Sequence, residues 1–120
     1  MGGRVYHANY FKFIERARSK LIESLNIDQR ALLLEEKKIF VVKNITADYQ
    51  LPAYFGDNLV ICTSLVELKK ASMVLKQAIL REDKKIFDSI VRLALLNSSE
   101  KPEKLSVEMV LDIKKFFKLK

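Results

Sequence analysis

The chain has few of the residues that build disulfide frameworks, metal sites or glycine-rich phosphate loops. Its 120 residues include one cysteine, one histidine, three glycines, two prolines and no tryptophan. With a single cysteine, Cys62, these residues hold no internal disulfide framework, and we expect a cytoplasmic location. One histidine and one cysteine far apart in sequence are not a metal-ligand set, so we expect no metal site and no cofactor.

Long apolar runs are also absent. No segment reaches the roughly 18 to 20 consecutive apolar residues that span a bilayer, and no charged-then-apolar leader stands at the N-terminus. Hydrophobic residues make up 49% of the chain and charged residues 31%, a balance typical of a globular protein. We therefore expect one soluble domain over residues 1–120, with no integral membrane segment.

The net charge of +7 has two interpretations. A basic surface attracts nucleic acid or anionic lipid, but the lysines are scattered and no aromatic-plus-basic platform accompanies them. Solvated turns and helix ends account for most of them, whereas a small phosphorylated ligand would need only one or two. We therefore expect no nucleic-acid partner. The scattered positions are Lys37, Lys38, Lys69, Lys70, Lys84, Lys85, Lys114, Lys115, Lys118 and Lys120.

The most informative stretch is the N-terminal one, Gly2-Gly3-Arg4-Val5-Tyr6-His7-Ala8-Asn9-Tyr10. It places two glycines and the only histidine directly before a long amphipathic pattern. Glycines let backbone N–H groups approach a ligand closely, and the N–H groups at a helix start carry the positive end of the helix dipole. This stretch is therefore a candidate site for binding or polarising an oxygen atom.

Apolar residues at three- and four-residue steps predict a helix over residues 8–26 that packs on a sheet. Asn26 is expected to end this helix, and Asp28 to cap a shorter helix that runs to about Lys37. Ser106 is expected to cap a final helix. The apolar stripe of the first helix consists of Tyr10, Phe13, Ile14, Ala17, Leu21 and Leu25.

Between the second and the final helix, β-branched and aromatic residues predict four strands, over residues 39–49, 58–68, 71–81 and 85–97. The last two strands are joined by the short polar link 82–84, as expected of an antiparallel hairpin. Both faces of these two strands are partly apolar, so one face needs a helix as cover and the other a partner sheet or subunit. The order of elements predicts an α+β fold with one long helix on an antiparallel sheet.

The N-terminal stretch, followed by Glu15-Arg16-Ala17-Arg18, resembles the hotdog-fold acyl-CoA thioesterases of the 4-hydroxybenzoyl-CoA thioesterase type. Within that family it is most similar to the bacterial subgroup associated with the Tol-Pal system. The likeness extends through Phe40-Val41-Val42, Asp48-Tyr49 and Pro52-Ala53 to the hairpin, and so covers nearly the whole chain. It implies a long helix wrapped by an antiparallel sheet, with pairs of sheets forming homodimers that gather into homotetramers.

The chain departs from the family pattern at its first residue. The family motif opens with a short strand that ends in the catalytic aspartate, which acts as nucleophile or as general base toward water. One residue separates that aspartate from the first glycine of the Gly2-Gly3 pair, and here this residue is Met1. By resemblance, the carboxylate and the first strand would lie upstream of Met1. We therefore expect an N-terminally truncated thioesterase with weak or absent hydrolysis.

The resemblance also assigns roles within the motif. The backbone N–H of His7 would hold the thioester oxygen, and its ring would orient substrate or assist proton transfer, beside Gly3, Tyr6 and Asn9. From the residues alone, His7 is equally well a polar residue at a helix start, and Tyr6 is better explained as core or pocket wall.

Two further sets of charged residues have competing explanations. By resemblance, cations at the start of the third predicted strand bind the phosphates of coenzyme A, and Lys69 and Lys70 stand there with Ser72 close by. Solvated turn lysines are an equally good explanation of that pair. Glu15 is a weaker candidate for the missing carboxylate than for an ion-pair partner of Arg16 or Arg18.

Together these features predict an acyl-CoA thioesterase that releases a free acid and coenzyme A, with coenzyme A as part of the substrate rather than a cofactor. The alternative is a non-catalytic hotdog module that binds acyl groups or another protein. A link to proteins of the cell envelope or of lipid synthesis also follows from the resemblance.

Overall fold

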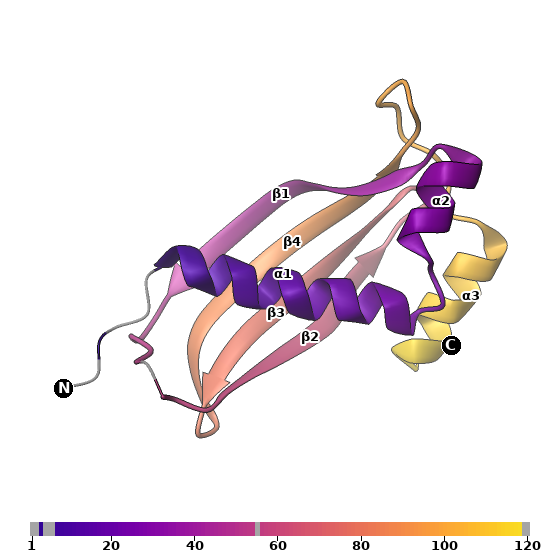
Figure 1. Cartoon of the computed structure of the whole chain (residues 1–120). Coiled ribbons are helices and arrows are strands. Elements are labelled where there is room, and N and C mark those ends of the chain that lie inside the picture. The colour runs from indigo at the N-terminus through magenta and orange to yellow at the C-terminus, as the bar shows by residue number, and fades with distance from the viewer. Residues whose placement is uncertain (1–2, 4–6, 55, 119–120) are drawn as a thin grey trace.

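The computed structural model describes residues 3, 7–54 and 56–118. Within them, every predicted helix and strand is present, with boundaries within two residues of the expected ones. No helix of this described part is long and apolar enough to cross a membrane. In chain order (Figure 1), the elements are α1 (His7–Ser24), α2 (Gln29–Glu36), β1 (Ile39–Tyr49), β2 (Leu59–Leu68), β3 (Ser72–Arg81), β4 (Lys84–Leu96) and α3 (Val107–Phe116).

The strands form one antiparallel sheet in the order β1-β4-β3-β2. Helix α1 crosses one face of this sheet, and α2 and α3 lie together at one end of it (Figure 1). Strands β2, β3 and β4 follow each other as a meander, while β1 pairs with β4, so that β1 and β2 are the two edges. The predicted α+β fold is confirmed. Within the described residues, no strand precedes α1.

Helix α1 packs on the sheet because its apolar stripe faces the alternate residues of the central strands. Near its start, Tyr10 and Ile14 are 2% and 0% exposed and pack with Ile79 and Phe87 of the sheet. Toward its end, the stripe packs in a second cluster with α2, α3 and the other half of the sheet. The two clusters fix α1 along the full length of one sheet face.

The predicted helix ends follow from local capping. Asp28 accepts a hydrogen bond from the Ala31 N–H at 3.0 Å, and Ser106 accepts one from the Met109 N–H at 3.1 Å. Asn26 adopts a φ of 62°, the left-handed conformation that ends helices. These short-range signals place α2 and α3 where the sequence predicts them.

The hairpin between β3 and β4 is tighter than predicted. Lys84 pairs with Arg81 in the sheet, so the connection consists of Glu82 and Asp83 alone rather than of three residues. Both adopt positive φ, 51° and 65°, which matches the two-residue turn whose twist suits antiparallel strands. The prediction was wrong by one residue because nothing in the turn, which lacks glycine, signals this conformation.

The face of the sheet opposite α1 is mixed in character. By alternation along the strands it carries Lys76 and Arg92 together with Val60 and Ile90, which are 60% and 37% exposed. The helices of the described residues lie on the other face. Cover of this second face by a partner subunit therefore stays a prediction.

Candidate active site

The first turn of α1 begins at His7, as the oxygen-binding interpretation requires. The first N–H groups of a helix have no acceptor within it and carry the positive end of its dipole. No acidic residue occupies this first turn to neutralise that end. Asn9 lies on α1 and is partly buried, Gly3 is exposed before the helix, and Tyr6 and the His7 side chain lie outside the described residues.

Tyr10 fastens the first turn of α1 to the segment that follows β1. Its hydroxyl oxygen accepts a hydrogen bond from the fully buried Ala53 N–H at 2.8 Å. Its ring lies 5.3 Å from the rings of both Tyr49 and Phe87, measured between centroids. Burial, and secondarily Tyr10, raises the pKa of the Tyr49 phenol above its ordinary value. Helix α1 thus starts on a packed aromatic base.

The same segment is clamped from the sheet side by Arg81. Its Nη1 atom donates to the Pro52 carbonyl at 2.7 Å and lies 3.4 Å from Oδ2 of Asp57. The same carboxylate oxygen accepts from the Tyr54 N–H at 2.8 Å. The segment that contains Pro52 and Asp57 is therefore a braced loop beside the start of α1.

The predicted coenzyme A residues come together in one pocket at the other end of the sheet. Lys69 and Lys70 form the turn between β2 and β3, and the pocket has a volume of about 750 Å³. Lys69 lies 3.6 Å from the exposed Glu67 carboxylate. The structure adds a cation that the sequence did not single out, Lys114 of α3. The full lining is Leu68, Lys69, Lys70, Ala71, Ser72, Val110 and Lys114.

Lys114 joins the lysine turn because the chain before α3 is bonded to that turn. The Leu105 N–H donates to the Lys70 carbonyl at 2.8 Å, immediately before the helix begins. This bond carries α3 to the β2–β3 turn and brings Val110 and Lys114 over it. The sequence did not predict that Lys114 lies beside Lys69 and Lys70, because it is more than forty residues away from them. The Lys114–Lys115 pair was the one sequence feature that pointed to a cation there.

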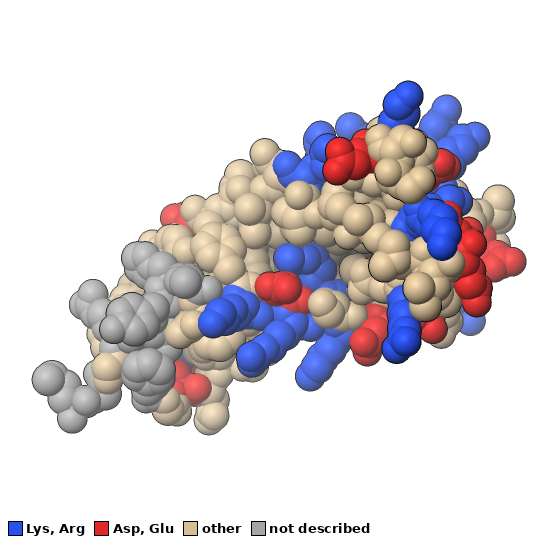
Figure 2. Space-filling view, turned by 45° about the horizontal axis from the view of Figure 1, so that its top comes forward, with Lys and Arg blue, Asp and Glu red and all other residues tan. Residues whose placement is uncertain are grey.

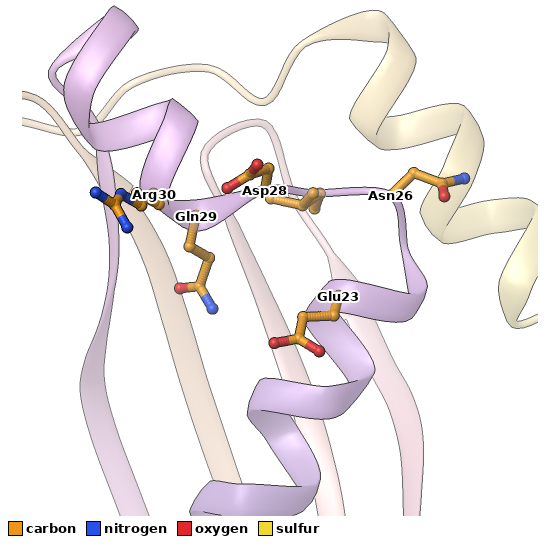
Figure 3. A pocket seen from close by; sticks show the side chains of 6 residues that line it. Glu23, Asn26, Asp28, Gln29 and Arg30 are labelled. Carbon is orange, nitrogen blue, oxygen red and sulfur yellow. The ribbon is translucent and has the colours of Figure 1, made fainter.

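A second hollow, of about 570 Å³, lies at the junction of α1 and α2 (Figure 3). Glu23 reaches it from the end of α1, and Gln29 and Arg30 reach it from the start of α2. Asp28 is engaged as the cap of α2. None of the described residues assigned by resemblance lines this hollow.

The described residues also contain no group of three histidine, cysteine or carboxylate side chains that could hold a metal ion.

On the face that Figure 2 shows, basic residues form several separate groups rather than one patch. Figure 2 shows lysine and arginine side chains distributed over one face of the molecule, with acidic side chains among them. Glu15 is exposed on α1 and, among the described residues, forms no salt bridge with Arg16 or Arg18. Burial lowers the pKa of the Arg18 guanidinium below its ordinary value, and the charge of Glu15 partly offsets that shift. The predicted pairing of Glu15 with Arg18 is therefore present as an electrostatic interaction but not as a close salt bridge.

Comparison with known proteins identifies sequence relatives of this chain. The acyl-CoA thioesterase YbgC of Haemophilus influenzae is 36% identical over 96 residues, which are 80% of this chain and 71% of the relative. The acyl-CoA thioesterase YbgC of Helicobacter pylori is 44% identical over 64% of this chain and 55% of its own length. This chain thus spans little more than half of the Helicobacter protein.

The fold also resembles that of thioesterases. The crystal structure of a probable thioesterase from Bartonella henselae superposes with a TM-score of 0.79 at 31% identity, over 87% of this chain and 86% of that one. A family model described as Thioesterase superfamily matches residues 2–87, a range that includes the N-terminal motif, α1 and most of the sheet. The predicted membership among thioester hydrolases of the hotdog fold is confirmed. The chain belongs to the thioesterase superfamily.

Proposed function

We propose that this chain binds acyl-CoA and, when a catalytic carboxylate is present, hydrolyses it to a free acid and coenzyme A. The observation that carries the proposal is the lysine pocket, where Lys69, Lys70 and Lys114 gather at the place that the resemblance assigns to the phosphates of coenzyme A. The names of the Haemophilus and Helicobacter relatives support the same substrate.

The start of α1 supplies the other half of the site. In the proposed reaction the thioester carbonyl oxygen points at the first turn, where the His7 backbone N–H is among the groups without a helical acceptor. As water or a carboxylate attacks the carbonyl carbon, negative charge develops on this oxygen. The N–H groups and the helix dipole stabilise that charge, which lowers the barrier.

We propose that the 120 residues alone hydrolyse acyl-CoA weakly, because the described part of the chain supplies no carboxylate from the first turn of α1 and the nearby Asp57 carboxylate is engaged by Arg81 and the Tyr54 N–H. The first turn of α1 contains no acidic residue, and Glu15 is exposed two turns further along the helix. An aspartate immediately before Met1, as the resemblance implies, would attack the carbonyl or activate water.

The two halves of the site lie far apart within one chain. Helix α1 has 18 residues, so its ends are separated by about 27 Å. Along β2, Leu59 packs with the cluster around Tyr10, while Leu68 at the far end lines the lysine pocket. A single chain therefore presents the oxygen site and the phosphate site at opposite ends of the same edge strand.

A homodimer resolves this separation. Strand β2 is an edge, and Val60 and Val66 on it are 60% and 57% exposed. If two copies pair their β2 edges antiparallel about a twofold axis, the Leu68 end of one lies beside the Leu59 end of the other. The lysine pocket of one copy then adjoins the α1 start of its partner. This geometry supports the proposed dimer with two shared sites.

The experiment measures thiol release from a series of acyl-CoAs by two chains. One is the 120-residue chain, and the other carries an added N-terminal strand of the type Tyr-x-Asp-Thr-Asp directly before Met1. We expect little turnover by the first and clear turnover by the second, with the last aspartate changed to asparagine as its matched control. Equal rates for the first two chains would contradict the assignment of the carboxylate.

A non-catalytic module is the second candidate, and the absence of an acid from the first turn of α1 favours it. It predicts that the extended chain binds acyl-CoA without turnover. The phosphate site has its own test, because charge reversal at both Lys69 and Lys70 should raise KM in the hydrolysing chain. An unchanged KM would show that the two lysines take no part in binding.

A further inference from the structure

Gln77 is a polar residue in the middle of the apolar strand β3. Its relative exposure is 0%, and it lies on the face covered by α1, opposite Ser89 of β4. A buried amide costs free energy unless its donors and acceptor are satisfied. A glutamine at this point of the core therefore needs partners, and those partners indicate what it does.

The amide of Gln77 bonds α1 through both of its polar ends. Its Nε2 atom donates to the Ile14 carbonyl of α1 at 3.0 Å. Its Oε1 atom accepts from the Arg18 guanidinium, one turn further along the same helix, at 2.9 Å. One side chain of the sheet therefore contacts two successive turns of α1 with bonds of opposite polarity.

Two further bonds brace Gln77 from within the sheet. The Ser89 hydroxyl donates to the Gln77 carbonyl at 3.0 Å, and Nε2 also lies 3.3 Å from the Thr63 hydroxyl oxygen of β2. The backbone of Gln77 is thus bonded to β4, and its side chain is held by Thr63 of β2 while it holds α1. A fully satisfied buried network of this kind fixes relative positions, because directional bonds do not tolerate the small shifts that apolar packing does.

The position held by Gln77 is transmitted to the first turn of α1. Ile14 is seven residues after His7, a distance of about 10 Å along a rigid helix. Sliding or rotating α1 on the sheet would carry its first N–H groups with it by the same amount. The bond between Tyr10 and Ala53 restrains the same turn through the loop that Arg81 braces, whereas Gln77 bonds the helix directly to the central strand β3.

We propose that Gln77 is a positioning residue for thioester hydrolysis: by holding Ile14 and Arg18, it sets the register of α1 that aims the first N–H groups at the carbonyl oxygen. The proposal rests on the proposed function above and adds a residue outside the motif. A displacement of the reacting groups by about 1 Å costs about a hundredfold in rate, so loss of this register lowers kcat.

The test substitutes Gln77→Met, which keeps the length of the side chain and removes both polar ends. Gln77→Glu is the second variant, since it keeps the acceptor for Arg18 and places a repelling oxygen against the Ile14 carbonyl. Thr63→Val is the matched control, because it removes only the bond within the sheet. All are made in whichever of the two chains described above hydrolyses acyl-CoA.

We expect kcat to fall about tenfold to a hundredfold in both Gln77 variants, with KM unchanged. The lysine pocket begins five residues away along β3, at Ser72, which is a distance of about 17 Å. Thr63→Val should leave both constants as they are. A purely structural role of Gln77 would instead lower the amount of folded protein without changing kcat per active site, and that result would overturn the proposal.

A second measurement needs no turnover. In the ligand-free 120-residue chain, amide NMR shifts of Ala8, Asn9 and Tyr10 should move in Gln77→Met and stay in place in Thr63→Val. Unmoved shifts in Gln77→Met would overturn the proposal whether or not acyl-CoA is hydrolysed. Absence of hydrolysis by the unsubstituted chains would contradict the proposed function alone, because the shifts would still report whether Gln77 sets α1.

Discussion

The two ends of the sheet are built by different physical means. At the start of α1, buried rings, a satisfied amide and a hydroxyl-to-backbone bond hold a helix end in one position. At the β2–β3 turn, three lysines surround an open pocket with long, largely exposed side chains. The first arrangement is suited to aiming dipoles during a reaction, whereas the second is suited to attracting charge. Substitutions at the first should therefore change folding and kcat, and those at the second should change KM.

The largest effect is expected at the packed end. Ile14→Ala removes a fully buried side chain from the contact between α1 and the sheet. We expect the free energy of unfolding to fall by about 2–5 kcal/mol, measured by urea denaturation. The control is Leu111→Ala on α3, where the side chain is 61% exposed and the change should be small. An equal loss of unfolding free energy at both positions would show that the contact between α1 and the sheet contributes no more than an exposed side chain does.

A smaller loss is expected from Tyr10→Phe, which keeps the ring and removes the hydroxyl oxygen. The fully buried Ala53 N–H then loses its acceptor, so stability should fall by about 1–3 kcal/mol. Tyr54→Phe is the control, since Tyr54 is 36% exposed. If the denaturation curves of the two variants coincide, the bond between Tyr10 and Ala53 does not stabilise the segment after β1.

At the open end the expected effect is kinetic. Lys114→Glu should raise KM for acyl-CoA about fivefold, since an exposed ion pair contributes up to about 1 kcal/mol, and the increase should shrink with added salt. The neighbouring Lys115 is exposed and does not line the pocket, so Lys115→Glu is a control of equal charge. The same increase in both variants would indicate a general field rather than a phosphate site.

The smallest effect concerns pH. Because burial raises the pKa of Tyr49 above the ordinary value of 10.0, the folded chain retains this proton more strongly than the unfolded chain. The resulting stabilisation is fully present below pH 10 and is lost as the pH rises through the folded pKa. Compared with the unsubstituted chain, Tyr49→Phe should therefore lose less stability above pH 10 in thermal unfolding. Parallel alkaline profiles would contradict the raised pKa.

The sequence predicted the features of this molecule that are set by short-range chemistry. Asp28 and Ser106 capped their helices because a carboxylate or hydroxyl before a helix satisfies its first N–H groups. The apolar stripe of α1 placed that helix on the sheet, and the strand boundaries followed from residue type. The two-residue turn at Glu82 and Asp83 was missed because it lacks the glycine that usually marks such turns, and glutamate does not favour the positive φ that it adopts.

Long-range neighbours escaped prediction. Gln77 bonds Ile14 and Arg18, which lie 63 and 59 residues away in the sequence. Lys114 lines a pocket with the β2–β3 turn, which is more than forty residues away. One local signal was available for Gln77, an amide within the apolar run of β3. Of the residues assigned by resemblance, His7 begins α1 one residue before the predicted start, and Lys69, Lys70 and Ser72 share one pocket; their chemical roles are proposals.

The proposal that the start of α1 serves the reaction and the lysine pocket binds phosphates is tested most directly by comparing two thioesters of the same acyl group. One is the acyl-CoA, and the other is the acyl-pantetheine, which has the same reacting centre and lacks the nucleotide phosphates. In the hydrolysing chain, we expect a higher kcat/KM for acyl-CoA than for acyl-pantetheine and a similar kcat for both. Combined reversal of Lys69, Lys70 and Lys114 to glutamate should abolish that preference. Equal kcat/KM for the two thioesters in the unsubstituted chain would show that the lysine pocket does not bind the nucleotide phosphates.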